Sequence, residues 1–239
     1  MKKIKIAHLY YDLMNLYGEH GNIRALEHHL DKHGITVSVD YLSIEDKINF
    51  NNYDLFYIGS GNEESFKLVL DNILKYKKDI KKAIDDKKIF IVTGNAIDLF
   101  GKDFHCLDDS VITTLDVLDY EAFETDFRIV GEQTYTCMLD DEIIGFQNRS
   151  SVLKYIKEPF LFEVKNGTGY VPNSMEEGIH KKNFYGTYLL GPILIRNPHL
   201  TEHIIKELCK EKDYEYEYYH DEFEERSYHE YKKNLLHEE

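Results

Sequence analysis

The stretch DLFYIGSGNEESFKLVL, residues 54–70, decides the fold class. Its first part, Asp54 to Ile58, is a short apolar run of the kind that forms a buried strand, and Gly59-Ser60-Gly61 ends it. From Glu63 an apolar stripe with helical spacing begins and continues to Asp85. A buried strand, a glycine turn and an amphipathic helix in this order indicate an α/β fold with a parallel sheet.

The same alternation of strand and helix continues on both sides of this stretch. The predicted strands are Ile4–Tyr10, Ile35–Leu42, Lys88–Thr93 and Phe184–Leu190, and the predicted helices are Ile23–Lys32, Glu63–Asp85, Asn95–Phe100 and His199–Lys210. Ligand sites in parallel sheets lie beyond the carboxyl ends of the strands. The loops Gly59–Asn62 and Thr93–Ala96 are therefore expected at the functional edge of the sheet.

The middle of the chain has a different texture. Between Ser110 and Phe162 the sequence divides into short strand-like pieces at Val111–Leu118, Phe127–Val130, Thr134–Leu139 and Ile143–Phe146. This pattern predicts an antiparallel excursion from the parallel sheet. We expect residues 1–210 to form one domain. Residues 211–239 should form an acidic, tyrosine-rich C-terminal helix or tail, either solvated or facing a partner.

Composition excludes several classes of protein. The chain has 44 acidic and 29 basic residues, a formal charge of −15, and no basic stripe with which to bind nucleic acid. No apolar run is long enough for a membrane span, and the first residues are too short an apolar stretch for a secretory signal, so we expect a cytoplasmic protein. The cysteines Cys106, Cys137 and Cys209 lie far apart, which predicts neither disulfides nor a zinc site, and no cofactor is expected.

Three segments of the chain resemble one enzyme family, the cobyric acid synthase-like branch of the class I glutamine amidotransferases. They are Leu9–Ile23, the glycine loop Ile58–Glu63, and Gly186–Leu194, and Arg128 and Gly131 also fit. Within this branch the chain is similar to the GatD subunits of lipid II isoglutaminyl synthases over nearly its whole length. The resemblance implies a three-layer, flavodoxin-like fold with a mainly parallel sheet. It also implies a Mur ligase-like, MurT-type partner in cell-wall peptide amidation.

The resemblance locates two catalytic positions, and neither holds the residue of the family. Where the family has its cysteine in a Cys-Gly-Gly-Tyr-Gln-x-Leu-Gly turn, this chain has Gly94-Asn-Ala-Ile-Asp-Leu-Phe-Gly101. Where the family has Thr-Tyr-x-His-Gly-Pro, this chain has Thr187-Tyr-Leu-Leu-Gly-Pro192, with Leu190 at the base position. Glycine has no atom with which to attack, and leucine cannot accept a proton. Hydrolysis of glutamine through a cysteine thioester should therefore be absent.

Other side chains near these positions offer weaker nucleophiles. Thr93 carries a hydroxyl next to the turn, but the base segment offers it only leucines, and its β-branched side chain suits the end of a strand. Cys106 is too far beyond the turn to occupy it, and all three cysteines are expected to be ordinary packed residues. A working hydrolase with a non-standard nucleophile stays open as an alternative.

Six residues are candidates for binding a ligand: Gly59, Ser60, Gly61, Asn62, Asn95 and Arg128. In the family, amides of the glycine loop and of the residue after the cysteine, here Asn95, would stabilise the tetrahedral intermediate. A strand-to-helix turn that needs glycine for its backbone explains the loop equally well. The Arg128 fork could hold the carboxylate of glutamine or another amino acid, or it could be a surface or ion-paired arginine. Gln147-Asn148-Arg149 stands where the family tends to have Glu-Asn-His.

Three histidines lie close together on the first predicted helix. His29 and His33 have the i, i+4 spacing that can bind a metal ion. The charged neighbours Glu27, Asp31 and Lys32 instead indicate a solvated helix face, which also includes His28. We therefore expect no metal site.

These observations favour a catalytically degenerate amidotransferase homologue that acts as a binding or scaffolding subunit. One alternative is an active glutaminase or amide hydrolase with an unrecognised nucleophile. The other is a sensor that binds glutamine or another amino acid at Arg128 without hydrolysing it.

Overall fold

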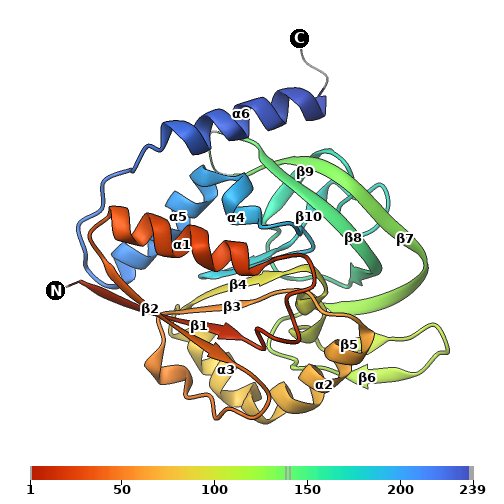
Figure 1. The fold of residues 1–239 in the computed structure, drawn as a ribbon. Coiled ribbons are helices and arrows are strands. Elements are labelled where there is room, and N and C mark those ends of the chain that lie inside the picture. Colours follow the sequence, from red (N-terminus) through yellow and green to blue (C-terminus); the bar gives the residue numbers. More distant parts are fainter. Residues whose placement is uncertain (1, 138, 140, 237–239) are drawn as a thin grey trace.

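The computed structural model describes residues 2–137, 139 and 141–236, and it contains two six-stranded sheets (Figure 1). The first sheet has the order β11-β12-β4-β3-β1-β2, and all its neighbouring strands are parallel except β11 and β12. Its strands are β1 (Lys3–Leu9), β2 (Thr36–Leu42), β3 (Leu55–Ile58), β4 (Ile89–Thr93), β11 (Ile179–Lys181) and β12 (Phe184–Thr187). The prediction of a mainly parallel, flavodoxin-like sheet is confirmed.

Helices cover both faces of this sheet and make three layers (Figure 1). One face carries α1 (His20–Lys32), α4 (Ile193–Arg196) and α5 (Pro198–Glu211), and the other carries α2 (Glu63–Ile73) and α3 (Lys77–Asp85). Side chains alternate along a strand, so β1 sends Ile4 and Ile6 into the core under α1, and Leu9 into the core over α2. The central strands β3, β4 and β12 are buried on both faces, which explains their continuous apolar runs.

The long helix predicted for residues 63–85 is in fact two helices, and this part of the prediction is wrong. A 3-10 turn, η2 (Leu74–Tyr76), separates α2 from α3. The turn directs the Tyr76 ring to Phe50, with 5.6 Å between ring centroids, and the Tyr76 hydroxyl accepts a hydrogen bond from the Ile48 amide. Phe50 begins another 3-10 turn, η1 (Phe50–Asn52), so tertiary packing overrides the apolar stripe at this point.

The second sheet is the predicted antiparallel excursion, although its strands differ from the predicted pieces. It contains β5 (Asp103–His105), β6 (Val111–Thr113), β7 (Glu121–Thr136), β8 (Ile143–Lys154), β9 (Phe162–Asn166) and β10 (Glu176–Glu177). The pieces predicted at 127–130 and 134–139 belong to the single strand β7, apart from its last residues, of which Met138 lies outside the described residues. An irregularity in the pairing of β7 with β8, between Glu124 and Ile129, hides the period-two pattern.

The C-terminal segment folds back onto the body of the protein. Its helix α6 (Glu222–Leu236) lies beside α4 and α5 (Figure 1). Tyr228 is buried and donates a hydrogen bond to the Glu142 carbonyl, and the Tyr214 hydroxyl accepts one from the Lys3 amide. Tyr214 and Tyr228 therefore serve intramolecular packing, whereas Tyr218 is exposed. Residues 237–239 of the predicted tail lie outside the described part. None of the helices in that part is long and apolar enough to cross a bilayer.

Candidate functional site

The glycine loop and the turn after β4 meet at the carboxyl end of the parallel sheet, as the sequence predicts. β3 and β4 are neighbours in register, with Ile58 opposite Val92, so the residues that follow them lie side by side. The Asn95 side chain joins the two loops. Its oxygen accepts hydrogen bonds from the Ser60 hydroxyl (2.9 Å) and the Gly61 amide (3.0 Å), and its nitrogen donates to the Gly61 carbonyl (2.9 Å).

Gly94 opens the 3-10 turn η3 (Gly94–Leu99) with a φ of +61°, in the left-handed region. A Cβ atom added to Gly94 would lie 2.5 Å from Leu190 Cδ2 and 2.6 Å from Ser60 Cβ. Leu190 is held there by a hydrogen bond of 2.7 Å from its amide to the Phe146 carbonyl on β8. The two positions that the resemblance pairs as nucleophile and base thus face each other, and the leucine fills the space between them.

A buried carboxyl lies beneath the glycine loop. Glu19 is 0% exposed, and its Oε2 accepts a hydrogen bond from the Ser60 amide at 2.6 Å. Its Oε1 accepts one from the Thr93 hydroxyl at 3.3 Å, and that hydroxyl also shares a 2.8 Å hydrogen bond with Tyr57. Burial raises the pKa of Glu19 to about 8, although the hydrogen bonds from Ser60 and Thr93 act in the opposite direction.

The glycines of the loop have a backbone reason to be glycine. A Cβ on Gly59 would lie 2.2 Å from Glu19 Oε2, and one on Gly61 would lie 2.5 Å from the sulfur of Met14. Asn62 has a structural role as well, because its side chain accepts a hydrogen bond from the Ser65 amide and caps α2. The loop packs against the segment between β1 and α1, and this packing accounts for its sequence.

A cleft of about 520 Å³ opens beside the loop, between α2 and the second sheet. It is lined by Leu16, Tyr17, Ser60, Gly61, Asn62, Glu63, Glu64, Phe66, Lys67, Asn95, Asp98, Phe104, Cys106, Ile112, Glu124, Arg128, Asn148, Arg149, Ser150 and Ser151. The cleft brings together Ser60, Gly61, Asn62, Asn95 and Arg128 of the predicted ligand residues, whereas Gly59 is not in its wall. Arg128 is exposed, and no carboxylate of the described residues lies within ion-pair distance of it.

Thr93 and the three cysteines, the possible alternative nucleophiles, lie in positions that do not favour catalysis. Thr93 is fully buried and is not in the wall of the cleft. Cys106 is half-buried and lines the cleft from the turn between β5 and β6, where the ring of Phe104 lies 5.6 Å from that of Phe66 on α2. Burial raises the pKa values of the Cys137 and Cys209 thiols, which disfavours their thiolates. No histidine is among the described residues that line the cleft.

A buried ionic network lies behind the cleft, and its members Asp98, Arg149 and Ser151 reach the cleft wall. The Asp98 carboxylate accepts hydrogen bonds from the hydroxyls of Ser151 (2.7 Å) and Tyr188 (2.5 Å). The Arg149 guanidinium stacks on the Tyr188 ring at 4.0 Å, and Glu177 accepts from the Tyr188 amide at 2.8 Å. Burial raises the pKa of Asp98 to about 6 and that of Glu177 to about 7, while Arg149 lowers both. The network holds β8 against the segment that carries Leu190.

His28, His29 and His33 were predicted on a solvated face, and that prediction is wrong for His29 of α1 and for His33, which follows it. His29 is 1% exposed and His33 is only partly exposed, because the C-terminal segment covers them, while His28 remains exposed. His29 bonds Glu202 of α5 through Nδ1 at 2.7 Å and Glu224 of α6 through Nε2 at 2.8 Å. Burial alone would lower the pKa of His29, but these two carboxylates raise it to about 9.

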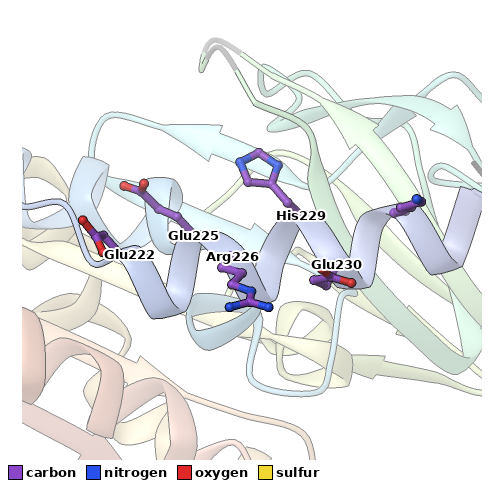
Figure 2. Close-up of a pocket in the computed structure, with 6 residues that line it drawn as sticks. Glu222, Glu225, Arg226, His229 and Glu230 are labelled. Atoms are coloured by element: carbon purple, nitrogen blue, oxygen red, sulfur yellow. The ribbon is translucent and has the colours of Figure 1, made fainter. Parts of the chain in front are cut away.

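A further hollow, of about 430 Å³, lies on the outer surface of α6 (Figure 2). Glu222, Glu225, Arg226, His229, Glu230 and Lys233 line it, all from this one helix. A hollow lined by a single helix has no facing wall, so the cleft beside the glycine loop is the better candidate site.

Comparison with known proteins identifies the family. Residues 5–198 match the CobB/CobQ-like glutamine amidotransferase domain. The chain belongs to this family. It is a GatD-like class I glutamine amidotransferase, since it is 30% identical over 217 residues to the subunit GatD of the glutamine-hydrolysing lipid II isoglutaminyl synthase of Staphylococcus aureus (strain N315). That match covers 91% of this chain and 89% of the relative. The subunit GatD of Streptococcus pneumoniae (strain ATCC BAA-255 / R6) is 30% identical over 214 residues, with 88% and 82% covered.

Solved structures agree on the fold of this amidotransferase family. A glutamine amidotransferase from Thermotoga maritima superposes with a TM-score of 0.51 at 15% identity, covering 98% of this chain and 94% of its own. The glutaminase domain of CTPS from Trypanosoma brucei, with bound acivicin, gives a TM-score of 0.58 at 10% identity, covering 90% and 96%. At these identities the likeness concerns the fold alone.

Several residues of this amidotransferase-like site were not foreseen from the sequence. Glu19 lies inside the resembling segment Leu9–Ile23, but nothing in its local pattern distinguishes a buried glutamate from a surface one. Asp98 and Glu177 likewise come from separate segments, and only the fold brings them to Arg149. The one sequence signal for these residues was Gln147-Asn148-Arg149, which differs from the Glu-Asn-His typical of the family and so marked this part of β8 as unusual.

Proposed function

We propose that this GatD-like chain is catalytically degenerate and acts as a binding or scaffolding subunit. Its partner would be a Mur ligase-like, MurT-type protein, and its pathway cell-wall peptide amidation. Support for the pathway comes from the two relatives, which are named as subunits of lipid II isoglutaminyl synthase. Support for the degeneracy comes from the residues at the two catalytic positions of the family, Gly94 and Leu190.

The packing of Leu190 against Gly94 carries the proposal. An attacking side chain at position 94 would begin with a Cβ atom 2.5 Å from Leu190 Cδ2, so the space for a nucleophile is already taken. The two glycine-loop amides that could donate to an oxyanion are also engaged, since the Gly61 amide donates to the Asn95 side chain and the Ser60 amide donates to Glu19. A site that has no nucleophile, and in which both loop amides are engaged, lacks the nucleophilic contribution to acyl transfer and has a weakened electrostatic one.

An active hydrolase with a non-standard nucleophile has less support. Thr93 is buried and its hydroxyl is bonded to Tyr57 and Glu19, so a substrate carbonyl cannot approach it without rearrangement of the loop. Cys106 is accessible from the cleft, but no histidine of the described residues shares that cleft with it. Neither residue has both an accessible nucleophilic atom and a base.

The sensor hypothesis has one specific observation in its favour, the open cleft. Arg128 and Lys67 are exposed cations in its wall, and among the described residues neither has an ion-pair partner. The Asn148 side-chain oxygen, also in the wall, is buried and has no hydrogen-bond partner. A cation and a free acceptor suit the carboxylate and the ammonium group of an amino acid.

Two experiments test these proposals. Purified protein, alone and with its co-purified partner, is incubated with glutamine and ammonia is measured. We expect no release above the buffer rate, and release that Thr93→Ala or Cys106→Ser abolishes would overturn the degeneracy. Affinity purification from the native cell should recover a Mur ligase-like protein, and recovery of a lone monomer would contradict the scaffolding role.

For the sensor, calorimetry with glutamine compares wild type with Arg128→Ala. The matched control is Arg226→Ala, an exposed arginine on α6 (Figure 2). Binding that Arg128→Ala removes and Arg226→Ala leaves intact would support amino-acid sensing. Absence of binding by wild type would favour scaffolding alone.

A further inference from the structure

Three metal-ligating side chains meet where the C-terminal segment crosses α1. His28 Nε2 of α1 lies 3.5 Å from Asp221 Oδ2, which precedes α6. Glu224, in the first turn of α6, completes the group, and one ligand atom from each residue lies within 4.8 Å of the others. For ligands about 2.0–2.1 Å from a zinc ion in a tetrahedron, the expected separation is roughly 3.4 Å. The distance between His28 and Asp221 already has this value.

Asp221 and Glu224 are each oriented by neighbours that leave a lone pair available for a metal ion. Asp221 uses Oδ1 to cap α6, accepting from the amides of Phe223 (3.0 Å) and Glu224 (3.2 Å). Its Oδ2, on the side of His28, accepts a hydrogen bond from the Tyr219 hydroxyl (3.2 Å) and keeps a second lone pair for a metal ion. Glu224 uses Oε2 to bond the buried His29, which leaves its other oxygen free. Such supporting hydrogen bonds are what orients the ligands of metal sites in proteins.

We propose that His28, Asp221 and Glu224 bind a divalent cation of the zinc class and thereby fasten α6 to α1. One imidazole nitrogen with two carboxylate oxygens suits zinc and its transition-metal neighbours, whereas magnesium and calcium prefer sites made of oxygen alone. The His28 side chain is 42% exposed, so an ion reaches the site from solvent and water completes its coordination. Glu224 moves toward the other two ligands on binding, which its 28% exposed side chain permits.

The site stands apart from the amidotransferase cleft and does not depend on the function proposed above. It also departs from the sequence-based expectation of no metal site, which rested on His29 and His33. Those two histidines are engaged by Glu202 and Glu224, and the histidine that remains for a metal is His28.

Zinc binding by the full chain tests the proposal. Chelator-treated protein is titrated with zinc chloride against a chromophoric chelator, and wild type is expected to bind one equivalent. His28→Ala removes a ligand and is expected to weaken binding by about 100-fold or more, beyond the effect of losing a supporting group. Asp221→Asn should weaken binding while keeping the helix cap, since asparagine caps as well as aspartate. His229→Ala, an exposed histidine of α6 (Figure 2), is the matched control and should bind as wild type does.

Hydrogen exchange of the α6 amides gives a second measurement. Zinc bound at an unrelated surface site would not slow this exchange. Zinc should slow this exchange in wild type and His229→Ala and leave it unchanged in His28→Ala. The proposal is overturned if wild type binds no zinc, if His28→Ala binds it equally well, or if binding leaves α6 unprotected. Magnesium chloride at the same concentration should have no effect, and equal protection by magnesium would contradict the zinc class.

Discussion

Replacement of Gly94 by alanine tests the central packing feature of the site. Two costs apply to Gly94→Ala. A non-glycine residue at φ +61° costs about 1–3 kcal/mol of backbone strain. The new Cβ would lie 2.5 Å from Leu190 Cδ2 and 2.6 Å from Ser60 Cβ, and such overpacking costs about 1–3 kcal/mol. We expect a loss of roughly 2–6 kcal/mol in the free energy of unfolding.

The double variant Gly94→Ala/Leu190→Ala separates these two costs. Leu190→Ala alone should cost about 2–5 kcal/mol as a buried leucine truncation. In the double variant the alanine at 94 occupies space that Leu190 has vacated, so only the backbone strain and the contact with Ser60 remain. The combined loss should therefore be smaller than the sum by about 0.5–3 kcal/mol. Urea unfolding of the four proteins measures this coupling, and strictly additive losses would refute the packing argument.

Three further substitutions have expected outcomes in urea unfolding. Burial gives the Glu19 carboxyl a pKa of about 8 in the folded protein against an ordinary 4.5, so the folded state binds the extra proton and stability falls as pH rises between these values. Glu19→Gln should remove that fall, and an unchanged pH slope would contradict it. His29→Ala leaves Glu202 buried without its closest partner and should cost about 3–5 kcal/mol, whereas the exposed His229→Ala should stay within about 0.5 kcal/mol of wild type. Arg149→Met removes a buried guanidinium bonded to backbone carbonyls and should cost about 3–5 kcal/mol, and a loss below about 1 kcal/mol would show that it is not needed for folding.

The parallel sheet and the two informative loops could be predicted because their signals are local. A strand such as Leu55–Ile58 is apolar throughout since both of its faces are covered, and Gly59 marks where it ends. The same reasoning failed for the helix predicted at 63–85. What breaks it is the packing of Tyr76 against Phe50, a contact between segments far apart in the sequence.

The sequence could predict which residues occupy the key positions of the site, but not how those residues contact one another. Gly94 and Leu190 could be placed by resemblance, but their contact, and the engagement of the loop amides by Asn95 and Glu19, are properties of the folded chain. For the histidines His28, His29 and His33, the position along the chain was misleading. Their charged neighbours indicated a solvated face, and only the returning C-terminal segment buries His29.

The contact between Gly94 and Leu190 also bears on how this lineage can change. A mutation that places a thiol at position 94 brings it against the leucine, and a mutation that places an imidazole at 190 provides no thiol for it to activate. Either step alone brings no gain in hydrolysis, and the first one is expected to lower stability as well. Under the degeneracy proposed above, a Cys–His pair at these two positions would therefore require two coordinated mutations.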